Sequence, residues 1–155
     1  MGCANGYPGG VDDDATPERI RALPSWLLAR AALRAQRTVA AHLEDAGMRR
    51  QHYTVLATLE ERGSASQAAL GRALGLDRSD LHAIVTALEE DALVTRERDP
   101  EDRRRNAVRL TAKGRRALAR LQTRIDAAQT ELLAGLSATD RRELLRLLDL
   151  LVAAG

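Results

Sequence analysis

The most informative part of this chain for its fold is the segment LDRSDLHAIVTALEEDALVTRERDPEDRRRNAVRLT at residues 76–111. It combines the pattern of a capped helix with those of two short strands. Asp77 is a typical N-cap residue, and Asp80 follows three positions later, as in a capping box. The apolar residues after them recur at the spacing of one buried helical stripe, at Leu81, Ile84, Val85 and Leu88. The pattern therefore predicts an amphipathic helix that begins at Arg78.

The opposite face of this helix is small and polar. It carries Ser79, His82, Ala83, Thr86 and Glu90. Such a face can approach a flat partner, for example the base edges in a DNA major groove about 12 Å wide. We interpret Ser79, His82 and Thr86 as candidate base readers and Glu90 as a solvated helix-end charge.

Two short strands are predicted after the helix, at residues 94–98 and 106–110. The segment between them begins with turn residues and ends in three arginines, which predicts a hairpin with a basic tip. Nine basic and four acidic residues lie between Val94 and Arg116, a local charge of +5 in a chain of net charge +2. A solvated charge run is the plainer explanation, but a basic hairpin beside a polar helix face favours nucleic acid.

The amino-acid composition argues against several other classes of protein. The chain has 155 residues, enough for one domain with a core, and its only aromatic residues are one Trp and two Tyr, which disfavours single-strand binding by base stacking. Of 24 basic residues only Lys113 is lysine, a bias that suits phosphate binding but also a GC-rich genome. The three histidines show no metal-ligand spacing, and no nucleophile motif or phosphate loop is present, so we expect no enzyme, metal or cofactor.

The predicted location is the cytoplasm. The single cysteine, Cys3, cannot form an internal disulfide, and the N-terminus lacks the pattern of a secretory signal. The most apolar stretch, residues 144–154, is interrupted by Arg146 and Asp149, so no membrane span is expected.

The remaining helices are predicted from their caps and apolar spacing. Residues 1–17 are expected to form a disordered tail, followed by helices at about 24–45, 50–62 and 67–74. Gly75 would join the last of these to the helix from Arg78 in a helix-turn-helix, and the strand pair would complete a winged helix-turn-helix. The fold class is thus mainly α with a small β-wing.

Dimerisation is predicted from the C-terminal third. Leu118, Leu121, Ile125, Ala128 and Leu132 repeat at spacings of 3 and 4, like a coiled-coil seam. A last helix, which begins near Ser137, carries leucines on more than one face and needs a second surface to cover them, most simply another copy of the chain. The candidate interface residues are Leu27, Leu132, Leu144, Leu147, Leu148 and Leu151.

In this order of features, residues 26–152 resemble the multiple antibiotic resistance regulator (MarR) family of winged-helix repressors. The most specific motifs are DPEDRR at residues 99–104 and LTAKGR at residues 110–115, which are similar to the family's wing motif and the segment after it. The match extends to SQAAL at residues 66–70 and to Leu88-Glu89 before Leu93-Val94.

The resemblance implies one domain over residues 18–155, with dimerisation helices at 18–47 and 112–155 and a winged helix-turn-helix at 50–111. It implies a homodimer on a pseudo-palindromic operator, with the helix from Arg78 in the major groove. Arg104 would enter the minor groove, oriented by Asp102. The full set of candidate DNA-binding residues is Gln67, Arg78, Ser79, His82, Thr86, Asp102, Arg103, Arg104 and Arg105.

Two positions depart from the family pattern. Ala92 stands where glycine is usual, so a less sharply turned helix end is expected. Ala83 stands where arginine is common, so one DNA contact is expected to be missing. Asp80 would place negative charge near DNA, which favours a capping role for it.

Effector binding is the least constrained expectation. The family commonly binds small aromatic or anionic molecules, and Trp26, Arg50, His52 and Tyr53 are the candidates here. His52 lies near an apolar stripe, where a packed or hydrogen-bonded histidine is the commoner role. His42 shows no discernible partner in the sequence and is expected at the surface or an interface.

The predicted function is a ligand-responsive transcriptional regulator, most simply a repressor. The competing hypothesis is a protein-interaction module that dimerises through residues 111–154 and docks its winged domain on a protein partner. The operator sequence, the regulated genes, the effector and the sign of regulation do not follow from the sequence.

Overall fold

The computed structural model describes residues 16–98 and 106–153, in two compact units divided within one helix, Met1–Arg37 and Thr38–Gly155. The first unit contains α1 (Glu18–Arg21) and most of α2 (Pro24–Glu44). Pro24 occupies the first helical position, where its missing N–H costs nothing. Trp26 is only 8% exposed, and the guanidinium of Arg30 lies 5.5 Å from its ring centroid, a cation–π geometry.

The second unit contains the end of α2 and the rest of the described elements. These are α3 (Arg50–Arg62), β1 (Ala65–Ser66), α4 (Gln67–Leu74), α5 (Arg78–Glu90), β2 (Val94–Arg98), β3 (Asn106–Leu110), α6 (Ala112–Leu132) and α7 (Ala138–Ala153). The predicted helices, the strand pair and the mainly α fold class are confirmed. Of the predicted tail, residues 1–15 lie outside the described residues.

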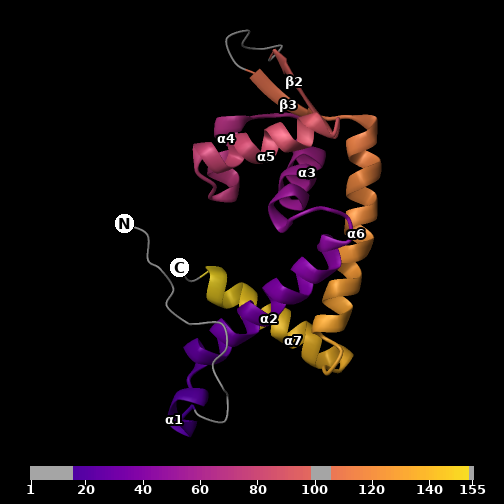
Figure 1. Cartoon of the computed structure of the whole chain (residues 1–155). Coiled ribbons are helices and arrows are strands. Elements are labelled where there is room, and N and C mark those ends of the chain that lie inside the picture. Colours follow the sequence, from indigo (N-terminus) through magenta and orange to yellow (C-terminus); the bar gives the residue numbers. More distant parts are fainter. Residues whose placement is uncertain (1–15, 99–105, 154–155) are drawn as a thin grey trace. The chain divides into compact units, whose positions relative to one another are not determined.

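The three strands form one antiparallel sheet in the order β1-β3-β2. In the β2–β3 hairpin Val94 pairs with Leu110 and Arg98 with Asn106, and the short β1 pairs Ala65 with Val108. Figure 1 shows α3, α4 and α5 gathered beside this hairpin, with α6 continuing from β3 along α3. The sheet thus connects the helix-turn-helix to the long helix α6.

The core of the second unit is aliphatic. Its fully buried side chains include Leu43, Leu56, Leu70, Leu81 and Val108, drawn from α2, α3, α4, α5 and β3. Leu118 and Leu121 of α6 belong to the same cluster. The interpretation of the 118–132 repeat as a coiled-coil seam therefore needs correction, because its first half fills the core of its own chain.

Helix α7 exposes much of its apolar surface in the single chain. Leu145, Leu147, Leu150 and Leu151 are between 45% and 59% exposed, and Val152 is 81% exposed. Leu144 and Leu148 are half-buried, as is Leu132 on α6. Among the residues that the structure describes, no helix is both long enough and apolar enough to span a membrane.

Candidate nucleic-acid interface

Helices α4 and α5 form the helix-turn-helix through a tight turn at Gly75. Ser66 caps α4 by accepting a bond of 3.2 Å from the amide of Ala69. Gly75 ends α4 in a left-handed conformation, with φ +63°, and its N–H bonds to the carbonyl of Gly71. The two helices are then held together by buried Leu70, Leu81 and other core residues. This confirms the predicted motif.

Asp77 caps α5 as predicted. Its Oδ1 accepts a bond of 2.8 Å from the amide of Asp80 and another of 2.8 Å from the hydroxyl of Ser79. These bonds, the Asp80 amide first, lower the pKa of the Asp77 carboxyl below its usual value. Ser79, a predicted base reader, is therefore also part of the cap, and it would have to turn its hydroxyl away from Asp77 to donate to a base.

A concave surface that encloses a volume of about 700 Å³ lies between the two helices of the motif. It brings together three of the predicted DNA-binding residues, Gln67 from α4 and Arg78 and His82 from α5. It also contains Arg72, which the sequence reading missed. Arg72 lies one helical turn after Ala68, which lines the same surface, so i to i+4 spacing on α4 was the available signal.

Thr86, the third predicted base reader, contacts the wing. Its Oγ1 accepts a bond of 2.8 Å from Nη2 of Arg96 on β2. The same guanidinium donates from Nη1 to Oε2 of Glu89 at 2.5 Å, and the Arg96 amide donates to Glu89 Oε1 at 3.2 Å. We call Thr86, Glu89 and Arg96 the helix–wing bracket. The sequence reading counted Arg96 only as positive charge.

The basic footprint counted from the sequence is smaller in the structure, because several of its members have acidic or carbonyl partners. Arg96 pairs with Glu89, and Nε of Arg109 lies 3.7 Å from Glu97 Oε2. Lys113 donates from Nζ to the carbonyl of Asp91 at 2.7 Å, at the C-terminus of α5. Arg115 and Arg116 are exposed. The predicted wing residues Asp102, Arg103, Arg104 and Arg105 lie outside the described residues.

The LTAKGR segment joins the wing to α6 through close backbone contacts. Thr111 caps α6 by accepting a bond from the amide of Gly114, and its hydroxyl lies 2.8 Å from the Ala92 carbonyl, to which it donates. A Cβ at Gly114 would lie 2.0 Å from the Leu93 carbonyl oxygen, so only glycine fits.

The end of α5 is sharply turned, contrary to our expectation for Ala92. Ala92 has φ +56°, a left-handed conformation that non-glycine residues rarely adopt. The amide of Leu93 bonds to the Leu88 carbonyl at 2.8 Å across this turn. The chain thus keeps the turn that glycine would make and places backbone strain at Ala92.

The candidate effector residues contact other parts of the chain. Nδ1 of half-buried His52 accepts a bond of 3.2 Å from the Arg49 amide at the start of α3. Burial lowers the pKa of His52, the charge of Arg49 lowers it further, and Asp91 partly offsets both. The hydroxyl of Tyr53 donates to Gln122 Oε1 on α6 at 2.6 Å, and Arg50 is exposed. Trp26 belongs to the other unit, where its ring contacts Arg30.

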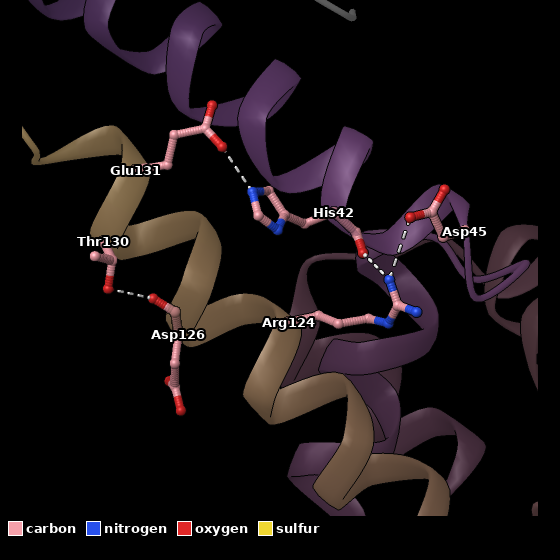
Figure 2. A network of polar contacts seen from close by, with 6 residues as sticks. All are labelled: His42, Asp45, Arg124, Asp126, Thr130 and Glu131. Carbon is pink, nitrogen blue, oxygen red and sulfur yellow. Dashed lines mark hydrogen bonds and ion pairs between the residues drawn. The ribbon is translucent and has the colours of Figure 1, made fainter.

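His42 has a partner that the sequence did not reveal. Its Nε2 lies 2.8 Å from Oε2 of Glu131 on α6. Figure 2 marks this contact with a dashed line. Nη1 of Arg124 donates to the His42 carbonyl at 3.2 Å and lies 3.5 Å from Asp45 Oδ2. No partner for His42 was discernible in the sequence because Glu131 lies 89 residues further along the chain. These contacts fasten the end of α2 to α6.

In the described part of the chain, no group of three or more His, Cys, Asp or Glu side chains is placed so that it could hold a metal ion.

Known proteins resemble this chain both in sequence and in fold. The MarR family model matches residues 46–105. A solved MarR-family transcriptional regulator from Rhodococcus sp. RHA1 is 30% identical, with 80% of this chain and 89% of that one covered and a TM-score of 0.71. The chain belongs to the MarR family. Members of this family are transcriptional regulators and not enzymes.

Two further relatives carry information about function. The transcriptional repressor CouR, solved on a 23-mer DNA duplex, is 28% identical, with 87% of this chain and 96% of that one covered and a TM-score of 0.79. CouR from Rhodococcus jostii RHA1 has also been solved with p-coumaroyl-CoA. A Thauera aromatica protein assigned as a transcriptional regulatory protein for the hcr operon is 35% identical over 96 residues, which are 62% of this chain and 58% of that relative.

Proposed function

We propose that this MarR-family protein binds double-stranded DNA as a homodimer and regulates transcription from a pseudo-palindromic operator. The observation that carries the proposal is the concave surface of the helix-turn-helix, where Gln67, Arg78 and His82 meet on two helices. Their amide, guanidinium and imidazole groups can each bond to base edges or phosphates. The likeness to CouR, a repressor solved on DNA, supports the same use of the fold.

Two kinds of contact with DNA would contribute, those to phosphates and those to base edges. Arg78, Arg72 and the wing arginines, Arg103, Arg104 and Arg105, would contact phosphates or enter the minor groove and supply most of the affinity, which then falls with salt. His82, Gln67, Thr86 and Ser79 would contact base edges and supply the specificity. Arg104, with Asp102 beside it in the sequence, is the proposed minor-groove residue.

A second copy of the chain would cover the apolar face of α7. Leu147 and Leu151 are exposed in the single chain, and clustered exposed aliphatic side chains are typical of an interface. Leu132, Leu144 and Leu148 would complete this contact. Leu27, which is exposed on the other unit, is a separate candidate for contact with the second copy. Two recognition helices in successive major grooves would lie about 34 Å apart, so the operator would be an inverted repeat with half-sites about one helical turn apart.

An effector would act by changing the distance between the two winged helix-turn-helix units of the dimer. CouR is solved with p-coumaroyl-CoA, which supports a small aromatic or anionic effector for this chain. Arg50, His52 and Tyr53 on α3 are the proposed contacts. An effector changes operator affinity only as far as it prefers one spacing over the other. Such a regulator works beside the chromosome, which fits the predicted cytoplasmic location.

The test uses the full-length protein and overlapping duplexes that span the DNA flanking its own gene. Fluorescence anisotropy at several salt concentrations should identify one duplex bound about 1,000-fold more tightly than the others at physiological salt. Arg78→Ala should weaken that complex, whereas Arg142→Ala on α7, an equal change of charge, should not. Equal affinity for all duplexes would instead favour the alternative, a protein-interaction module.

A further inference from the structure

The helix–wing bracket links the two elements that would contact DNA. Arg96 lies at the centre of β2, opposite Val108 of β3, whereas Thr86 and Glu89 lie three residues apart on α5. Glu89 accepts from both the amide and the guanidinium of Arg96, so the carboxylate fixes the strand backbone as well as the side chain. The bracket therefore sets the position of the wing strand on the recognition helix.

The contacts of Arg96 within the bracket make it poorly suited to bind a DNA phosphate. The Arg96 side chain is 22% exposed and forms a charge-assisted bond with Glu89, which is 36% exposed. Its Nε is buried and, within the described residues, has no hydrogen-bond partner. A phosphate contact by this guanidinium would gain less than one by an unpaired arginine, because the Glu89 carboxylate already neutralises its charge. Arg96 thus differs from the exposed arginines Arg72 and Arg78 of the helix-turn-helix.

The bracket also decides what Thr86 can offer to a partner. A hydroxyl has one proton to donate and can accept through its oxygen. Because Oγ1 of Thr86 accepts from Arg96 Nη2, one of its two lone pairs is occupied and its proton stays available. Thr86 can therefore act as a donor while it remains bonded to Arg96. Donors match acceptors on base edges, such as guanine O6 and N7 or thymine O4.

We propose that Arg96 is a positioning residue for operator recognition, which holds the wing on α5 through Glu89 and orients the Thr86 hydroxyl as a donor toward the DNA. The proposal rests on the proposed function. Net charge alone would lead us to expect tighter DNA binding when Glu89 is lost, because a negative charge near the DNA is removed. The proposal predicts the opposite result, namely that loss of Glu89 weakens specific binding.

The experiment measures affinity of full-length variants for the operator duplex and for a scrambled duplex, over a range of salt. Glu89→Gln and Arg96→Met should each weaken operator binding about tenfold, leave the scrambled duplex within about twofold, and keep the salt slope. Glu90→Gln is the matched control, because Glu90 is the exposed neighbour with the same charge and it should behave as wild type. Circular dichroism checks that each variant is folded.

The opposite pattern identifies a phosphate contact. In that case Glu89→Gln would free Arg96 and tighten binding to both duplexes, and Arg96→Met would weaken both equally and lower the salt slope by about 0.9. Either result overturns the proposal. If wild type does not prefer the operator to the scrambled duplex, the proposed function fails first, whatever the variants do.

Thr86 supplies a second test that does not remove the ion pair. Thr86→Val should cost about tenfold in operator affinity and Thr86→Ser should restore most of it. In the Arg96→Met background, Thr86→Val should cost at most about twofold, because the donor is no longer oriented. Equal losses in both backgrounds would show that Arg96 does not act through Thr86 and would overturn that part of the proposal.

Discussion

Gly114→Ala should destabilise the protein more than any other substitution of a described glycine by alanine. The added Cβ would lie 2.0 Å from the Leu93 carbonyl oxygen, 3.0 Å from its carbon and 3.1 Å from Leu110 Cδ2. Ordinary contact begins at 3.4 Å, so α6 and the start of β2 must separate by about 1.4 Å, the difference from 2.0 Å. The contacted atom is backbone, which cannot rotate away.

The cost follows from the contacts that converge at this point. Overpacking of this kind costs about 1–3 kcal/mol. The separation also strains three hydrogen bonds, Thr111 Oγ1 to the Ala92 carbonyl, the Thr111 amide to the Leu93 carbonyl and Lys113 Nζ to the Asp91 carbonyl. Each contributes about 0.5–1.5 kcal/mol. Alanine is better in a helix by about 1 kcal/mol. The net loss should be about 2–6 kcal/mol, a large share of the about 5–15 kcal/mol that stabilises a domain.

Urea unfolding followed by circular dichroism measures this loss at one fixed protein concentration, because oligomerisation would make the midpoint depend on concentration. Gly135→Ala is the matched control, since nothing lies within 4 Å of its added Cβ, and it should change stability by less than about 1 kcal/mol. A Gly114→Ala protein within about 1 kcal/mol of wild type would refute the close contact between α6 and Leu93.

Four further predictions concern other parts of the chain. Ala92→Gly should raise the free energy of unfolding by about 0.5–1 kcal/mol, since φ +56° strains alanine, and an unchanged urea midpoint would argue against that strain. His52 has a folded pKa below its ordinary 6.5, so its contribution to stability is complete above pH 6.5 and is lost as pH falls through the folded value. His52→Gln should therefore flatten the fall in unfolding free energy below pH 6.5, and an unchanged slope would exclude His52 as its source. Arg104→Ala should weaken duplex binding with the dimer intact; equal affinity would rule out its minor-groove role. Glutamates at both Leu147 and Leu151 should yield monomers in sedimentation experiments, and a persistent dimer would exclude α7 from the interface.

Local features of the fold were predictable because each depends on residues close in sequence. Arg50–Arg62 was predicted to the residue, since apolar spacing and Gly63 mark its extent. Asp77 is a cap in the structure as predicted, because a cap requires only an amide two or three residues later. For the candidate site, the structure shows that Arg78 and His82 line one concave surface, and their contacts with DNA stay predictions.

Pairings between distant residues were not predictable from the single sequence. Counting charge treated Arg96, Arg109 and Lys113 as available for DNA, although each contacts a group in its own chain. Periodicity identified the stripe at Leu118 and Leu121 but not the surface that covers it, because spacing reports which residues share a face and not what the face meets. The Glu131 partner of His42 was hidden for the same reason.

In the proposed function, two copies of the winged helix-turn-helix bind DNA at a fixed spacing. Selection of full-length protein against a library of random-sequence duplexes, followed by sequencing of the bound fraction, tests this even while the operator sequence is unknown. An inverted repeat with half-site centres about one helical turn, roughly 10 base pairs, apart should be enriched. Enrichment of a single half-site, or of no sequence at all, would contradict binding by two copies at a fixed spacing.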